Sequence, residues 1–121
     1  MNAPRLPVNM LDDGLIECGD YDDWATACSA IKRYPDDRVK LDELLRSIPE
    51  EGLREPLWIE VSARSLRTYL IDGHHRAVAL MELGIKEFPY RWRWRFPKSR
   101  PRPAAGEPLP DSVLQLLREG S

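Results

Sequence analysis

The pattern of apolar and polar positions predicts a helix in the N-terminal third of the chain. Its apolar residues recur at i, i+3, i+4 and i+7, the spacing of one face of an α-helix: Trp24, Ala27, Cys28 and Ile31. The aspartates from Asp20 onward suit a helix start because they complement the positive end of the helix dipole. Pro35 ends the run. Residues 1–19 show only short apolar pieces broken by polar residues.

A second helix is predicted through VKLDELLRSI, with Asp36 or Asp37 as its cap. Its apolar stripe repeats the same spacing: Leu41, Leu44, Leu45 and Ile48. Lys40, Glu43 and Ser47 share the side of this helix opposite the stripe, because they lie at i, i+3 and i+7. That side presents a cation, a carboxylate and a hydroxyl to a ligand; the alternative is an ordinary solvated helix surface.

Beyond Gly52 the pattern becomes typical of strands. LWIEV (57–61) and SLRTYLI (65–71) predict two strands that pair through a short turn. An apolar helix, AVALMELG (77–84), follows, and its last glycine is expected to form the C-cap. IKEFPYRWRWRF (85–96) then returns as a third strand. The alternation of strands and helices predicts the α/β fold class.

In the third strand, period-two alternation places the aromatic side chains on one face and the arginines on the other. The aromatic set is Trp92, Trp94 and Phe96, and the basic set is Arg91, Arg93 and Arg95. We favour tryptophans in the core and arginines in solvent. Two alternatives stay open: the strand binds nucleic acid by stacking bases and neutralising phosphates, or its arginines reach the phosphate turn described below.

Composition describes an ordinary globular chain of 121 residues, 42% hydrophobic and 31% charged, which fits one compact domain. No apolar run approaches the ~18 residues of a membrane span, and MNAPRLPVN has no apolar signal core, so a cytoplasmic protein is expected. Cys18 and Cys28 lack the spacing of a zinc or redox motif and are expected to be free thiols.

Charge is unevenly distributed, and prolines mark a boundary near the C-terminus. The net charge is −2, yet residues 91–103 carry basic side chains and no acid, which suggests an anionic partner near that segment. Prolines recur in residues 97–110, which we predict to be a linker after a domain at 1–96. A short terminal helix is expected in 111–121, capped by Asp111. Its apolar face packs either on this chain or on a second copy, which would form a homodimer.

The turn DGHHR carries the candidate chemistry, because it opens a helix directly after a strand. The first amides of such a helix are unsatisfied and bind phosphate. Gly73 lets a ligand approach the backbone, Arg76 can fork onto two oxygens, and His74 and His75 add donors. Asp72 can hold Mg²⁺ or orient a histidine. Two alternatives are a plain helix start capped by Asp72, and a metal site at the two histidines.

The order of two motifs resembles the ParB/sulfiredoxin superfamily. They are ELLRSIPEEGLREPLWIEV, a helix ending in Ser-Ile before a strand, and YLIDGHHRAVALMELGI, a strand leading into a Gly-x-x-Arg phosphate turn. The resemblance covers about residues 36–96. It implies a small domain with a mixed sheet and packed helices, and a nucleotide ligand: CTP in ParB, ATP in sulfiredoxin, ADP in the free serine kinases.

The resemblance also implies roles for individual residues. Gly73, His75 and Arg76 match the Gly-Cys-His-Arg turn of sulfiredoxin, and Lys40 and Ser47 match nucleotide-contacting positions on its preceding helix.

The free serine kinases carry Asp-Gly-His-Thr-Arg, which Asp72, Gly73, His74 and Arg76 match best. Glu43 matches an acidic position of ParB-like proteins and is our candidate for a catalytic base.

Two departures from the family argue against two of its known activities, reduction and DNA partition. His74 stands where sulfiredoxin has its reactive cysteine, and Cys18 and Cys28 lie outside the matching region, which argues against reductase activity. A helix-turn-helix module, which ParB partition proteins carry after this domain, is not expected in a proline linker and one short helix.

The expected function is therefore nucleotide phosphate binding with Mg²⁺, as a weak NTPase or a molecular switch. The expected ligand-binding residues are Lys40, Ser47, Gly73, His74, His75 and Arg76. Asp72 is the candidate metal ligand, and Glu43 and Asp72 are the candidate catalytic residues. The alternatives are a small-molecule phosphotransferase, a ParB-like nuclease, and a nucleic-acid adaptor that uses Arg91, Arg93 and Arg95.

Overall fold

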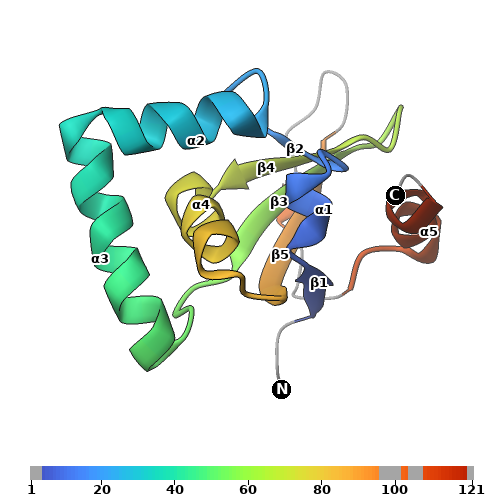
Figure 1. Ribbon diagram of the computed structural model, residues 1–121. Coiled ribbons are helices and arrows are strands. Elements are labelled where there is room, and N and C mark those ends of the chain that lie inside the picture. Colours follow the sequence, from blue (N-terminus) through green and yellow to red (C-terminus); the bar gives the residue numbers. More distant parts are fainter. Residues whose placement is uncertain (1–3, 96–101, 104–107, 120–121) are drawn as a thin grey trace.

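A computed structural model describes residues 4–95, 102–103 and 108–119 of the chain. Figure 1 shows its elements in their spatial arrangement. In chain order they are β1 (Arg5–Pro7), α1 (Asn9–Asp12), β2 (Ile16–Cys18), α2 (Trp24–Arg33), α3 (Pro35–Glu51), β3 (Leu57–Ser62), β4 (Thr68–Asp72), α4 (His74–Leu83), β5 (Glu87–Arg95), β6 (Arg102–Pro103) and α5 (Asp111–Glu119).

The described strands form one mixed sheet in the order β1-β5-β3-β4-β2, and β6 pairs with β5. β3 lies parallel to β5 and antiparallel to β4, and β2 lies parallel to β4. The strands expected at 57–61, 65–71 and 85–96 correspond to β3, β4 and β5, with β4 beginning only at Thr68 and Phe96 lying outside the described residues. The pairing of β2 beside β4 brings the end of β2 close to the DGHHR turn.

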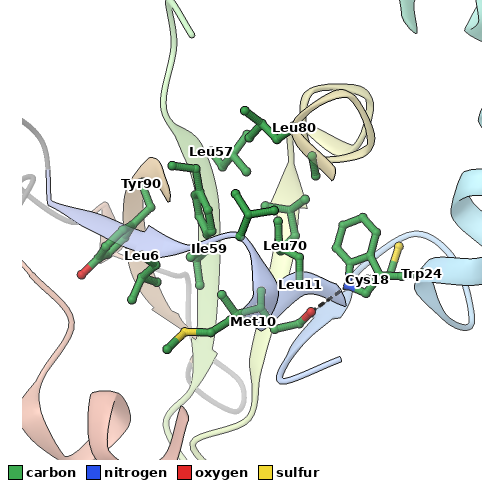
Figure 2. Close-up of a cluster of buried hydrophobic side chains, with 14 of the residues drawn as sticks. Leu6, Met10, Leu11, Cys18, Trp24, Leu57, Ile59, Leu70, Leu80 and Tyr90 are labelled. Atoms are coloured by element: carbon green, nitrogen blue, oxygen red, sulfur yellow. Dashed lines mark hydrogen bonds between the residues drawn. The ribbon is translucent and has the colours of Figure 1, made fainter. Parts of the chain in front are cut away.

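The core lies on one face of the sheet. Alternate residues of β3 and β5 are buried there, among them Leu57, Ile59 and Tyr90. Figure 2 shows these side chains together with Leu11 of α1 and Leu80 of α4. Each such aliphatic side chain, when fully buried, stabilises the fold by about 1.5–3 kcal/mol relative to exposure.

The expected core role of the third strand's tryptophans is confirmed, and its arginines face solvent as expected. Trp92 is buried and Trp94 partly so, and Phe96 lies outside the described residues. Arg91 and Arg95 are exposed and Arg93 is partly exposed. What the sequence did not indicate is that Arg93 and Arg95 also pair with the buried carboxylate of Glu60.

The two predicted helices are α2 and α3, separated by a single residue. Asp23 caps α2 by accepting a hydrogen bond from the Thr26 amide at 2.7 Å. Pro35, which ends the first helical run, occupies the first turn of α3, where its missing N–H costs nothing. The predicted cap at Asp36 or Asp37 is wrong: Tyr34 is the N-cap of α3 and provides no side-chain hydrogen bond.

The C-terminal part packs on its own chain. Val113 and Leu117 of α5 are buried. Leu109 is buried as well, and its amide donates to the Tyr90 hydroxyl at 2.8 Å. The segment expected to be a linker, 97–110, contains the short strand β6, because extended prolines are tolerated at a sheet edge; residues 97–101 and 104–107 lie outside the described residues.

Both cysteines are free: Cys18 is buried and Cys28 is half-buried. Burial raises the pKa of each thiol, whereas a reactive cysteine needs a lowered one. None of the described helices is long and apolar enough to cross a membrane.

Candidate functional site

A pocket of about 750 Å³ lies between α3 and the turn that starts α4. α3 contributes Lys40, Glu43 and Ser47 to its lining. The DGHHR turn contributes Asp72, Gly73, His74, His75 and Arg76. The structure thus brings together the residues expected to bind the nucleotide and Mg²⁺ or to act in catalysis, whereas Arg91, Arg93 and Arg95 do not line this pocket.

The turn starts α4 without a side-chain cap. Gly73 is the N-cap, with φ +101°, and no side chain caps it. The expected alternative with Asp72 as cap is therefore wrong. The Ala77 amide donates to the Gly73 carbonyl at 2.8 Å, so the amides of the three residues before Ala77 precede the first bond of the helix.

Gly73 is required for a reason that the sequence did not indicate. A Cβ at this position would lie 2.7 Å from Leu57 Cδ2 and 3.0 Å from Arg76 Nη2. The turn therefore packs tightly against β3 and the guanidinium. The glycine is needed for this internal contact and for its positive φ.

Arg76 joins the start of α4 to the entry of β3. Its Nη1 donates to the carbonyls of Glu55 and Pro56 at 3.0 and 3.1 Å, and its side chain is 16% exposed. Its Nη2 lies 3.6 Å from Asp72 Oδ2. Only part of the guanidinium thus remains for a ligand, where the sequence suggested the whole fork.

His74 differs most from its expected role. It is 6% exposed, and its ring packs against Tyr21 and Trp24 at centroid distances of 6.0 and 5.9 Å. Nδ1 lies 3.4 Å from Asp20 Oδ2, while the buried Nε2 has no hydrogen-bond partner in the described structure. Burial lowers the pKa of His74, so at neutral pH the ring is uncharged and anchors the turn in the core.

His75 connects the two helices that line the pocket. Its Nε2 lies 2.8 Å from Asp37 Oδ1, in the first turn of α3. Asp37 therefore holds α3 against α4 and does not act as the expected helix cap. His75, like His74, was expected to donate a hydrogen bond to phosphate. Its contact with Asp37 occupies one of its two ring nitrogens.

On α3, the expected grouping of polar residues is confirmed, but its orientation is corrected. Lys40, Glu43 and Ser47 line the pocket together with Leu44, a member of the apolar stripe. The polar side thus adjoins the stripe and does not lie opposite it. A ligand in the pocket meets both a charged and an apolar part of the wall.

The pocket also contains residues that sequence reasoning missed. Arg46, Glu51 and Arg54 come from α3 and the segment after it, and Asp20 and Tyr21 follow β2. Glu51 lies one turn beyond Ser47, so helical spacing could have found it. Asp20 and Tyr21 could not be found that way, because only the pairing of β2 with β4 brings them here.

The charged residues of the lining are balanced. Lys40, Arg46, Arg54 and Arg76 supply positive charge, and Asp20, Glu43, Glu51 and Asp72 supply negative charge. Glu51 pairs with Arg54, whereas Lys40 is exposed. No group of three His, Cys, Asp or Glu side chains that could hold a metal occurs in residues 4–95, 102–103 and 108–119.

These residues fit Mg²⁺ only in company with a phosphate. Mg²⁺ keeps several waters and is usually bound by one or two carboxylates plus substrate oxygens. Asp72 and Glu43 can supply such carboxylates from the two walls. An ion held by protein ligands alone would need more of them.

Comparison with known proteins supports the fold. Neither a scan of protein-family models nor a search of curated proteins found a match. Among solved structures, the chain resembles the crystal structure of sulfiredoxin from Arabidopsis thaliana, with a TM-score of 0.52 and 22% sequence identity. The match covers 79% of this chain and 89% of that one. As the order of its motifs predicted, the chain has a sulfiredoxin-like fold.

Proposed function

We propose that the pocket binds a nucleoside di- or triphosphate together with Mg²⁺. One observation carries this proposal: the uncapped start of α4 lies in a pocket that Lys40, Ser47 and Arg76 also line. Unsatisfied helix amides and the helix dipole favour a phosphate. Its volume lies within the range of about 300–1,000 Å³ typical of small-molecule sites.

In this proposal the phosphates lie at the amides of His74, His75 and Arg76, and Lys40 neutralises part of their charge. The Ser47 hydroxyl donates to a phosphate oxygen. Asp72 binds the Mg²⁺ that accompanies the ligand, and the bound cation offsets the repulsion between the acidic residues of the lining and the phosphates. Leu44 and Tyr21 offer an apolar surface to the nucleoside.

Two carboxylates facing a bound phosphate also support phosphotransfer as a second candidate function. Phosphoryl transfer requires mainly positioning and charge neutralisation, with a carboxylate to accept the proton of the attacking hydroxyl. Glu43 on α3 and Asp72 at the turn lie on opposite walls of the pocket. Glu43 would be the base and Asp72 the metal ligand, which gives the chain NTPase or small-molecule kinase activity.

Binding is tested by calorimetric titration and thermal unfolding with ADP, ATP, CTP and GTP, each with Mg²⁺. Ligand at about one hundred times its Kd should stabilise the folded state by about 2.7 kcal/mol. Lys40→Ala should weaken binding about tenfold because it removes one charge-assisted contact. Lys86→Ala, an exposed lysine away from the pocket, is the matched control.

The absence of any stabilisation by these four nucleotides at millimolar concentration would refute the binding proposal. Turnover is tested separately with Glu43→Gln. That variant should keep nucleotide affinity within a few-fold and lose phosphate release or transfer. Unchanged turnover in Glu43→Gln would remove the assignment of the base while leaving the binding proposal intact.

A further inference from the structure

The face of the sheet opposite the core carries a surface of arginines and aromatic rings. We call it the basic strip: Arg91, Arg93 and Arg95 of β5, Trp58 of β3 and Tyr69 of β4. In the strand register, Trp58 is paired with Arg91, and Glu60 is paired with both Arg93 and Tyr69. Paired residues of neighbouring strands point to the same face. The strip therefore spans three adjacent strands.

Glu60 fixes the strip from beneath. Its side chain is 4% exposed and pairs with Nε of Arg93, at 2.8 Å, and with Nε of Arg95. The arginines themselves are 37% and 52% exposed. A guanidinium has five N–H donors, so contacts through Nε leave both terminal amino groups for another acceptor. One carboxylate also neutralises only one of two cations.

A second set of contacts orders the end of the strip at Arg95 and Tyr69. The guanidiniums of Arg95 and Arg67 lie 5.2 and 5.7 Å from the centre of the Tyr69 ring, within cation–π range. Arg67 is held in turn by two hydrogen bonds to Glu17, at 2.9 and 2.6 Å. These cations are thus ordered before any ligand arrives, which lowers the entropic cost of binding.

At the opposite end of the strip from Arg95, Arg91 and Trp58 lie next to each other. Arg91 is exposed, and no acidic side chain pairs with it in the described part of the chain. Trp58 is half-buried, in contrast to the fully buried residues that flank it on the core face of β3. An aromatic ring beside a free cation can stack a base next to a phosphate.

We infer that the basic strip binds single-stranded nucleic acid. Arg91, Arg93 and Arg95 repeat every second residue along an extended strand, about 6.6 Å apart, and form a row of cations for successive phosphates. Trp58 stacks a base beside this row. Sheet faces that combine aromatic and basic side chains serve this purpose in other RNA-binding modules. An acidic peptide would use the cations but not the ring, and a duplex would hide its bases from Trp58.

The inference is tested by fluorescence anisotropy of a labelled oligonucleotide of about 10 nucleotides, within the range that single-strand binders cover. We expect Arg91→Ala to weaken binding several-fold and to reduce the slope of log Kd against log salt concentration by about one phosphate contact. Trp58→Leu should weaken binding about tenfold with an unchanged salt slope, because stacking carries no charge. Arg33→Ala, an exposed arginine on α2, is the matched control and should bind as the unmodified chain does.

Competitors identify both the partner and the place of binding. Polyglutamate and duplex DNA should compete weakly, and ADP with Mg²⁺ should not displace the oligonucleotide, since no residue of the strip lines the nucleotide pocket. Displacement by ADP would place the oligonucleotide in the pocket and overturn the inference. Equal competition by polyglutamate would show that the strip binds anions in general, and this would also overturn the inference. An equal loss of oligonucleotide affinity in Trp58→Leu and Arg33→Ala would overturn it as well. So would the absence of binding at low salt.

Discussion

Replacing Gly73 with alanine should destabilise the domain through two separable effects. An L-residue in the left-handed region costs about 1–2 kcal/mol. The new Cβ would also lie 2.7 Å from Leu57 Cδ2, and an overpacked core contact of this kind costs about 1–3 kcal/mol. The expected total loss is therefore about 2–5 kcal/mol in the free energy of unfolding. Urea denaturation at constant m-value measures it directly.

Gly84→Ala is the matched control. Gly84 also has positive φ, +67°, but a Cβ there meets nothing within 4 Å. This variant should lose only the backbone part, about 1–2 kcal/mol. The contact part is isolated by repeating Gly73→Ala in a Leu57→Val background, which lacks the clashing methyl group. The loss should shrink by about 1 kcal/mol or more there, and identical losses in both backgrounds would refute the packing explanation.

Three further changes test contacts around the site and the strip. Glu60→Gln should cost about 1–2 kcal/mol in urea unfolding, less than a fully buried pair because Arg93 and Arg95 are partly exposed; no loss would show that the carboxylate does not organise them. Arg76→Lys should lower thermal stability by the equivalent of about 1–3 kcal/mol, since an ammonium cannot replace a guanidinium on two carbonyls; a wild-type melting temperature would contradict this. Because burial lowers the pKa of His74 below its ordinary value of 6.5, the unfolded state takes up this proton first. The free energy of unfolding should therefore fall as pH drops below 6.5, by at most about 1.4 kcal/mol per pH unit. In His74→Gln this part of the pH dependence should be absent, which urea midpoints measured at several pH values would show.

Elements with strong local signals could be predicted from the sequence. α2, α3 and α4 have apolar stripes at helical spacing, and β3 and β5 alternate or carry continuous apolar runs. β1, β2 and β6 could not be predicted, because strands of two or three residues have no periodicity of their own. They exist through partners elsewhere in the chain: β1 and β6 on β5, and β2 on β4.

The candidate site was predictable only in part. Local spacing grouped Lys40, Glu43 and Ser47 on one helix side and the DGHHR residues in one turn, but it did not indicate the remaining lining residues, such as Asp20 and Tyr21. The burial of His74 depends on Tyr21 and Trp24, which reach it through the packing of α2 and the end of β2. Likewise, nothing near Arg93 in the sequence indicated that Glu60 would lie beneath it. Such facts depend on the tertiary arrangement.

The pairing of β1 with β5 bears on how the chain folds as it is made. Arg5 lies opposite Pro89 in this ladder, so β1 has no partner until β5, more than seventy residues later in the chain, has been synthesised. At about 5–20 residues per second, β1 waits roughly 4–16 s. Until then β3, the central strand of the order, also lacks one of its two neighbours. Nascent chains stalled before β5 should therefore be held open by chaperones or degraded, and the domain should close in a late, concerted step.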